Sequence, residues 1–467
     1  MTEPGIPDAS DLEDIQGLVY GGWNDHQYAG FLFATLGPDP RRSRRWLDEL
    51  RQAVTPVARH RRRAPGRLQV ALSPSGLAAL GVPDDVIGAL PRELCAGMAS
   101  RRHALDDSDP ATWQLGGPGD RLDVLIMVYA RDPAARAAQL DRQRAALLEA
   151  GAQVRPDELS WPLPDREHFG FADGLSQPFL PGLNTEPRPG EDKVPVGEIL
   201  LGYPNAYGRH PISPVWDDLD LGKNGSFLVF RKLQQDVARF WGWIADHARR
   251  LARGDIAEAT LLADLIGAKL VGRWRSGASL VLTPDRDDPA LAAPDRVNNF
   301  KYLVHDPDGL RCPIASHVRR ANPRDARGGS AQESETVISR HRILRRGRSF
   351  GSPLPYEDAL AGRDDGVTRG LYFICLQSSI ARGFEFIQQT WLANPGFGGL
   401  YCEPDLIVGD PAGRGHITIP AEPVRLRLDG VPTVVTHVGG GYFFLPSLAA
   451  LRRIAAGPRP ARPLAPP

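Results

Sequence analysis

The sequence has few cysteines and no net charge, and these two absences exclude several classes of protein. Only four cysteines occur in 467 residues, at Cys95, Cys312, Cys375 and Cys402, and no two of them are spaced as C-x-x-C. This pattern argues against a disulfide framework and against a structural zinc site, and it fits a reducing compartment. The 56 Lys and Arg residues balance 56 Asp and Glu residues. The chain therefore lacks the basic excess that is typical of proteins that bind nucleic acids or anionic membranes.

The sequence also lacks a segment with the pattern of a secretory signal or a membrane span. Residues 1–12 are acidic and do not show the basic and then apolar order of a signal peptide, so we expect a cytoplasmic protein. The longest stretch without charge, 430–451, is nearly long enough to cross a bilayer, but Pro432, residues 439–441 and Pro446 would break a spanning helix. We therefore predict a buried strand there, with a turn on either side.

The hydrophobic pattern predicts strands and helices that do not alternate regularly along the chain. Runs of apolar and aromatic residues predict strands at 28–36, 68–72, 124–129, 226–230, 371–376 and 442–445. Helical spacing and composition predict helices at 43–54, 134–150, 237–248 and 380–392. This order favours an α+β fold with antiparallel sheets flanked by helices over a doubly wound fold.

Two loop-rich stretches, 161–214 and 285–355, interrupt these elements, and long irregular stretches inside a compact chain are more often functional than accidental. We predict two domains, 1–212 and 213–456, followed by a Pro-rich disordered tail over 457–467.

One short motif suggests a hydrolase. Residues 347–351 match G-x-S-x-G, with Ser349 as the possible nucleophile. Such an elbow needs a strand before it and a helix after it, whereas the next four residues are Ser-Pro-Leu-Pro, which cannot open a regular helix. A hydrolase is thus a minor alternative, and no P-loop or Rossmann glycine pattern supports nucleotide binding.

Two other positions could carry redox or acid–base chemistry. A haem iron needs only one imidazole from the protein, and His317, five residues before Asn322-Pro323, is a candidate for it. Its spacing alone does not distinguish it from a surface or core histidine. Asp173, between glycines and apolar residues, could be an acid or base at a pocket wall or simply part of an Asp-Gly turn.

Taken together, these segments resemble the dye-decolorising peroxidases, a family of haem peroxidases. Residues 170–174 match the G-x-x-D-G signature of that family, and Ser-Gln-Pro at 176–178 extends it as in the longer-chain branch. Residues 317–324 are similar to the proximal-ligand motif, and 341–347 resemble the segment that carries the distal arginine. The resemblance extends from about residue 14 to about residue 451, with the three motifs in the family's order.

The resemblance implies two ferredoxin-like domains, with one haem b held mainly by the C-terminal domain. It implies that His317 ligates the iron, that Asp173 moves the proton of hydrogen peroxide, and that Arg345 stabilises the charge that develops as the peroxide bond breaks. A carboxylate is expected behind His317, and either Asp405 or Asp410 could supply it. The haem contacts that it implies are Gly174, Leu175, Ser176, His317, Asn322, Pro323, Arg324, Arg345, Leu371 and Phe373.

The function implied is that of a haem-dependent peroxidase. It would reduce hydrogen peroxide while it oxidises organic donors such as dyes and phenols in one-electron steps, with bulky donors reacting at the surface. The alternative is a haem-binding or haem-delivery protein with incidental peroxidase activity. Asp173 and Arg345 favour the peroxidase, because haem storage requires neither. No nucleic-acid or membrane partner is expected, and the sequence leaves the physiological donor and the oligomeric state open.

Overall fold

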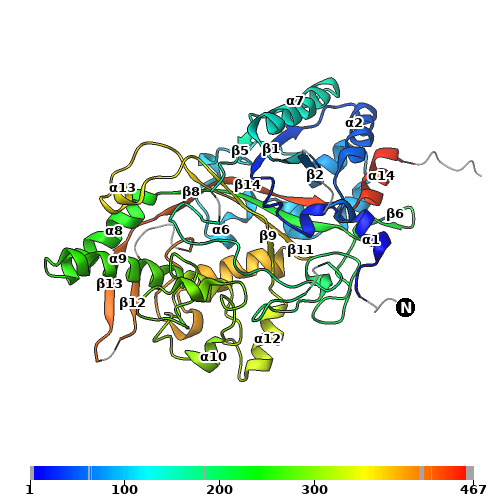
Figure 1. Cartoon of the computed structure of the whole chain (residues 1–467). Helices are drawn as coiled ribbons and strands as arrows, with labels where there is room; N and C mark the ends of the chain where they lie inside the picture. Colours follow the sequence, from blue (N-terminus) through cyan, green and yellow to red (C-terminus); the bar gives the residue numbers. More distant parts are fainter. Residues whose placement is uncertain are drawn as a thin grey trace, which may run out of the picture.

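The fold is built on one large antiparallel sheet surrounded by helices (Figure 1). The computed structural model describes residues 5–60, 64, 66–163, 165–183, 186–409, 415–421 and 423–458. The strand order is β10-β11-β8-β14-β2-β3-β1-β4, with β5 also paired to β1 and β9 to β11. The strands are β1 Tyr28–Thr35, β2 Gly66–Leu72, β3 Val124–Ala130, β4 Gln153–Val154, β5 Glu158–Leu159, β8 Ser226–Gln235, β9 Leu344–Arg345, β10 Arg348–Phe350, β11 Gly370–Gln377 and β14 Val435–Leu445.

The central strands are apolar on both faces because both faces of the sheet are covered. In β1, Leu32 and Ala34 contribute to one hydrophobic core, while the alternate residues Phe31 and Phe33 contribute to another. Successive side chains of a strand point to opposite faces, so a strand that is buried on both sides reads as a continuous apolar run. This explains why β1, β3 and the first half of β8 were recognisable in the sequence.

Strand β14 connects the two groups of strands. It pairs with β8 along most of its length and with β2 through Phe444 and Leu72. The register shifts between His437 and Gly440, where an added Cβ on Gly440 would lie 2.1 Å from the carbonyl oxygen of Phe230. Only glycine permits such a close approach of two backbones. The predicted buried strand within 430–451 is thus confirmed.

Helices α2 (Pro40–Ala53), α7 (Pro133–Glu149) and α14 (Leu448–Ala456) cover the β1–β3 end of the sheet. Both α2 and α7 begin with an Asp cap followed by proline, at Asp39 and Asp132. The cap accepts a hydrogen bond from a free backbone N–H, and proline loses nothing at the first helical position. Trp46, Leu47 and Leu50 form the buried face of α2.

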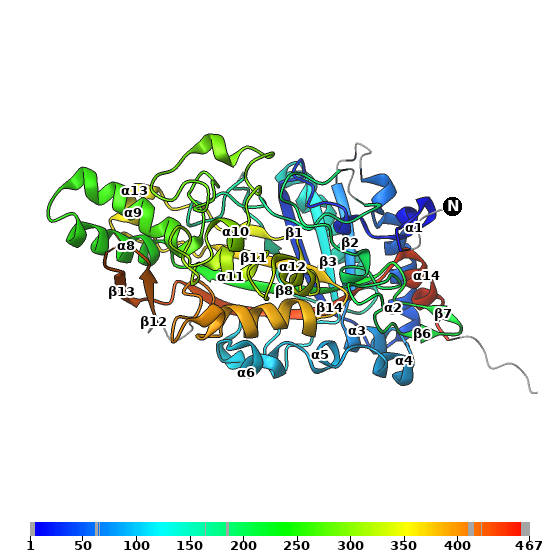
Figure 2. The same ribbon diagram turned by 90° about the horizontal axis from the view of Figure 1, so that it is seen from below.

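The other end of the molecule carries α8 (Val237–Leu251), α9 (Ile256–Val271) and the short α13 (Tyr356–Leu360), which lie far from α14 in both ribbon views (Figure 2). The predicted helix at 380–392 is present, but it forms two π-helical segments, η7 (Ala381–Glu385) and η8 (Ile387–Leu392). A hairpin of β12 (Gly415–Ile419) and β13 (Leu426–Val431) projects near α8.

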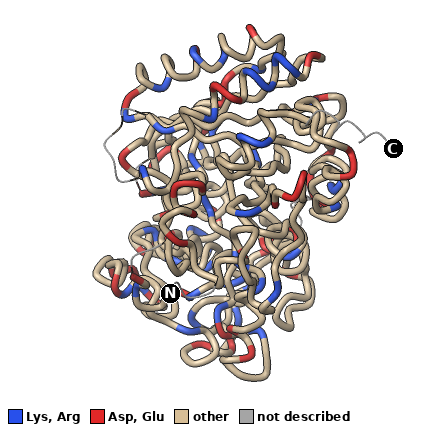
Figure 3. The backbone as a smooth tube through the Cα atoms, turned by 90° about the vertical axis from the view of Figure 1, so that its right-hand side faces the viewer, with Lys and Arg blue, Asp and Glu red and all other residues tan. Residues whose placement is uncertain are grey.

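The antiparallel pairing and the flanking helices confirm the predicted α+β class. The division at residue 212 stays a prediction, and residues 459–467 of the predicted tail lie outside the described residues. In the described part of the chain, no helix has the length and apolar character needed to cross a membrane. Acidic and basic residues are interspersed along the whole fold (Figure 3), as the balanced composition suggests.

Candidate active site

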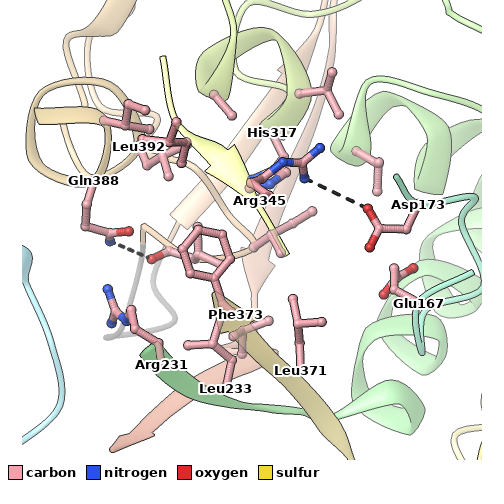
Figure 4. A pocket seen from close by; sticks show the side chains of 18 of the residues that line it. Glu167, Asp173, Arg231, Leu233, His317, Arg345, Leu371, Phe373, Gln388 and Leu392 are labelled. Atoms are coloured by element: carbon pink, nitrogen blue, oxygen red, sulfur yellow. Dashed lines mark hydrogen bonds and ion pairs between the residues drawn. The ribbon is translucent and has the colours of Figure 1, made fainter. Parts of the chain in front are cut away.

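A cavity of about 420 Å³ opens between the large sheet and a group of short helices (Figure 4). Strands β8, β9, β11 and β14 supply one set of lining side chains. The helix α11 (His317–Ala321) and the segment η8 supply the other. Each of the segments 170–174, 317–324 and 341–347 contributes at least one residue to this cavity.

His317 is the first residue of α11, and its imidazole is held by a carboxylate. Its Nδ1 lies 2.9 Å from Oδ2 of Asp405, whose side chain is completely buried. The other oxygen of Asp405 accepts hydrogen bonds from the backbone N–H groups of Ile407 and Val408. The carboxylate is therefore immobilised from both sides. Between the two alternatives, the structure places Asp405 behind His317, while Asp410 lies outside the described residues.

This pairing determines which nitrogen of His317 is available. Because the carboxylate accepts a hydrogen bond, Nδ1 carries the proton, and Nε2 keeps its lone pair for a metal. Burial would lower the pKa of His317, but the charge and hydrogen bond of Asp405 raise it overall. Burial likewise would raise the pKa of Asp405, and the interaction with His317 lowers it. The His317 side chain is 29% exposed, so its ring reaches the cavity.

The other histidines near the cavity do not combine these properties. The Nδ1–H of His341 donates to the carbonyl of Arg382, and its ring stacks on Phe386. Both ring nitrogens of His437 are buried from solvent. His168 is buried, and its Nε2–H donates to the carbonyl of Phe350. His317 is thus the cavity histidine with an exposed ring and a carboxylate behind it.

Asp173 and Arg345 face each other across another part of the cavity wall. A side-chain oxygen of Asp173 lies 3.9 Å from Nη1 of Arg345, and the two side chains are 47% and 41% exposed. The Nη2–H of Arg345 donates to the carbonyl of Ser176. Both side chains keep free hydrogen-bonding capacity toward the cavity, as a proton carrier and a charge-stabilising cation require.

The backbone of β9 determines which of two adjacent arginines enters the cavity. The amide of Gln177 accepts from the N–H of Arg345 and donates to its carbonyl. Arg346 points the opposite way, and its guanidinium donates to the carbonyls of Leu18 and Val19. Neighbouring residues of an extended segment face opposite sides, so only one of the two arginines enters the cavity.

Three further arginines line the cavity near Arg345. Arg273 and Arg324 both donate to the side-chain oxygen of Asn298, while the pKa of Arg342 is lowered by burial and by the charges of Arg324 and Arg345. Such a concentration of buried positive charge favours an anionic ligand group.

A porphyrin with two carboxylates fits these residues. The cavity also has an apolar surface that includes Leu233, Leu371, Phe373, Ile387 and Leu392. An apolar slot with one free imidazole and several arginines matches the flat apolar ring, the iron and the carboxylates of haem. Seven of the expected haem contacts line the cavity: Ser176, His317, Asn322, Arg324, Arg345, Leu371 and Phe373. Gly174, Leu175 and Pro323 are not among the lining residues.

Sequence reasoning missed several charged residues of the wall. Glu167 lies next to Asp173, and at the opposite end Arg231 forms a buried ion pair with Asp107. Glu167 lies three residues before the first glycine of the 170–174 motif, so proximity could have identified it. Arg231 and Asp107 are 124 residues apart in the chain, and no local pattern connects them.

The hydrolase alternative finds no support in the geometry around Ser349. This residue lies in the middle of β10, paired with Leu371 of β11. The next helix, α13, begins only at Tyr356. The strand-to-helix turn that exposes a nucleophilic serine is therefore absent at this position.

Comparison with known proteins gives consistent matches over almost the whole chain. A dye-decolorizing peroxidase of Exidia glandulosa is 32% identical, with 96% of this chain and 89% of the relative covered. A crystal structure of a fungal DyP-type peroxidase from Auricularia auricula-judae has a TM-score of 0.82 at 28% identity and covers 97% of this chain and 100% of that one. The structure of a dye-decolorizing peroxidase in complex with 2,6-dimethoxyphenol has a TM-score of 0.79 at 28% identity and covers 95% of this chain and 99% of that one. No family model matches the chain.

Proposed function

Since the chain belongs to the dye-decolorising peroxidase family and is a haem peroxidase, we propose that it binds one haem b in the cavity, with His317 as the axial ligand. Asp173 would carry the proton of hydrogen peroxide, and Arg345 would stabilise the developing charge. The observation that carries this proposal is the single cavity that joins an imidazole backed by Asp405 to the Asp173–Arg345 pair.

Each residue has a defined task in this proposal. When bound, the haem supplies the iron at which peroxide is reduced and the oxidising equivalents that organic donors then consume. Asp173 accepts the proton from one peroxide oxygen and returns it to the other, which becomes water. Arg345, oriented by its hydrogen bond to the carbonyl of Ser176, stabilises the negative charge on the departing oxygen. Asp405 keeps the proton of His317 on Nδ1.

The remaining residues of the proposal support the cofactor. Arg324 and Arg342 would bind the haem carboxylates, and Leu371 and Phe373 would cover the ring and keep the space beside Asp173 narrow. Gly174, Leu175 and Pro323 would support the haem through the backbone of the neighbouring lining residues. Most lining residues follow position 213, which supports a haem site carried mainly by the 213–456 unit.

Hydrogen peroxide and small organic electron donors are the substrates. We infer that phenols are among the donors, because a structural relative is a complex with 2,6-dimethoxyphenol. Bulky dyes would react at the surface, since the cavity is too small to hold them beside haem. A cytoplasmic location stays a prediction, and the four cysteines, all free in the structure, support it.

An absorption spectrum before and after one equivalent of peroxide tests this function. We expect a Soret band, and we expect peroxide to change it rapidly and a phenol to restore it. A haem-delivery protein would show the band without a rapid change. A hydrolase would show no band, and it would lose esterase activity in a Ser349→Ala variant.

A further inference from the structure

Residues 165–173 form a tight hairpin that determines where Asp173 lies. The backbone N–H of Glu167 donates to the carbonyl of Phe171, and the N–H of Asp173 donates to the carbonyl of Asp165. Asp173 is therefore the last residue of the hairpin, opposite its first residue. Any change in the shape of the hairpin would move the Asp173 carboxylate relative to Arg345.

The carboxylate of Glu167 is the centre of this hairpin. Its Oε2 accepts hydrogen bonds from the N–H of Phe169 at 2.8 Å and from Nε2 of Gln235 at 2.8 Å. Its Oε1 accepts from the N–H of Phe171 at 3.0 Å. Gln235 is the last residue of β8, so one carboxylate connects two backbone groups of the hairpin to the sheet. Hydrogen bonds to a charged acceptor are stronger than those between neutral groups.

The hairpin is attached to the rest of the protein in a second way, which does not involve Glu167. Phe169 and Phe171 pack in the core with Phe240 and Trp241, and Nε1 of Trp241 donates to the carbonyl of Phe169. Loss of the Glu167 carboxylate should therefore leave the protein folded. It should loosen the side of the hairpin that faces β8 and the cavity.

Glu167 is more than a solvated surface residue. It lies on the cavity wall, on the same side as Asp173 (Figure 4), and it makes no ion pair with a neighbouring arginine within 4.0 Å in the described part of the chain. Burial raises its pKa to about 7, against the three hydrogen bonds, which lower it. The site thus retains a carboxylate where burial opposes its charge, and the donors of the hairpin and of β8 compensate for it.

We propose that Glu167 is a positioning residue of the peroxidase reaction, whose carboxylate holds the 165–173 hairpin against β8 and so sets the position of Asp173 opposite Arg345. The proposal rests on the role of Asp173 given above. Glu167 itself need not exchange a proton with peroxide.

The test compares Glu167→Gln with a control that removes the same charge elsewhere. The amide of Gln keeps the shape but replaces one acceptor oxygen with an N–H donor, which cannot satisfy the donors that face it. Glu149→Gln, at the exposed end of α7, is the matched control. Gln235→Met removes only the donor from β8 and should give an intermediate effect.

The first measurement does not depend on turnover. Amide hydrogen exchange of the peptide 166–174, with and without haem, should be about tenfold faster or more in Glu167→Gln and unchanged in Glu149→Gln, because the anchored amides open more often. Unchanged exchange in Glu167→Gln would overturn the proposal.

The second measurement is the rate of the peroxide-driven Soret change across pH, with Asp173→Asn beside it. In Glu167→Gln we expect this rate to fall about 10 to 100-fold at pH 8, where the Glu167 carboxylate is charged, as for a misplaced reacting group, with the haem content retained. Below pH 7 the parent's Glu167 takes up a proton, so the difference between the two proteins should shrink there. A parent rate at pH 8 despite faster exchange would overturn the positioning role, and a slower rate with unchanged exchange would make Glu167 a proton carrier instead. A parent rate in Asp173→Asn would refute the proposed role of Asp173, which is a different failure.

Discussion

Oδ2 of Asp405 lies 2.9 Å from Nδ1 of His317, and Oδ1 of the same carboxylate accepts two backbone N–H groups of the next turn. The carboxylate therefore determines both the direction and the protonation of the imidazole. This relationship connects a residue of the recognised motif with one that is 88 positions further along the chain.

Asp405→Asn should weaken haem binding although it nearly keeps the shape. The new amide N–H would face Nδ1–H of His317, so the ring must move its proton to Nε2 or turn, and either change weakens the bond to iron. Loss of such a supporting group typically lowers metal affinity by about 10 to 100-fold. Haem transfer to an excess of a haem-free acceptor protein measures the effect, with the exposed Asp429→Asn as the control. An unchanged transfer rate would remove Asp405 from this role.

His317→Ala should abolish or strongly reduce haem retention, because the iron loses its only strong protein ligand. Free imidazole added to the variant should restore a Soret band, since the truncated side chain leaves room for it. His437 lines the same cavity, and His437→Gln serves as the control that should retain haem. Haem loss in His437→Gln together with normal content in His317→Ala would transfer the ligand role to His437.

The sequence predicted the strands that are buried on both faces and missed the half of β8 whose polar side chains line the cavity. The strand expected at 226–230 in fact continues to Gln235. Its second half is mostly polar, with Arg231 and Gln235 lining the cavity, while its backbone still pairs with β11 and β14. Hydrophobic periodicity cannot detect a strand whose face points into a polar site.

The candidate site also contains residues that the sequence identified and residues that only the structure identifies. His317, Asp173 and Arg345 were identified because each belongs to a continuous motif. The choice of Asp405 required the structure, as did the pair of Asp107 and Arg231, because these contacts join distant segments. A local sequence pattern indicates the structure of one loop, whereas contacts between distant segments depend on how the sheet and helices pack.

Arg345→Leu should affect the rate of the peroxide step, whereas Arg346→Leu should affect the stability of the fold. Arg345→Leu removes the cation beside Asp173 and should slow the peroxide step by about 10² to 10³-fold, with little change in stability. Arg346→Leu leaves the buried carbonyls of Leu18 and Val19 without donors, which should lower the free energy of unfolding by about 1 to 3 kcal/mol. Stopped-flow spectra and urea unfolding of both variants check this, and the reverse ranking would assign the catalytic role to Arg346.

Asp173→Asn should slow the peroxide step by about 10²-fold or more, because the amide cannot accept the proton. Haem binding should be intact, since Asp173 is nearly half exposed and contributes no ligand. The rate of the peroxide-driven Soret change, measured from pH 3 to pH 8, is the relevant quantity. If the variant matches the parent throughout, Asp173 is a turn residue and the proton moves by another route.

His168 should make the fold less stable in mild acid. Burial lowers its pKa to about 4, while its hydrogen bond to the carbonyl of Phe350 acts in the opposite direction. An unfolded histidine has a pKa of about 6.5, so the unfolded state takes up the proton first, and stability is lost as the pH falls from about 6.5 to about 4. Between pH 7 and pH 5, this should reduce the free energy of unfolding by about 2 kcal/mol.

Urea unfolding should show that the His168→Gln variant lacks this part of the decrease in stability, whereas the His210→Gln variant, changed at an exposed position, retains it. The raised pKa of Glu167 acts in the opposite direction, but it is present in all three proteins, so the difference between them reports on His168. Equal losses in the parent and His168→Gln would show that His168 takes up its proton without unfolding the protein.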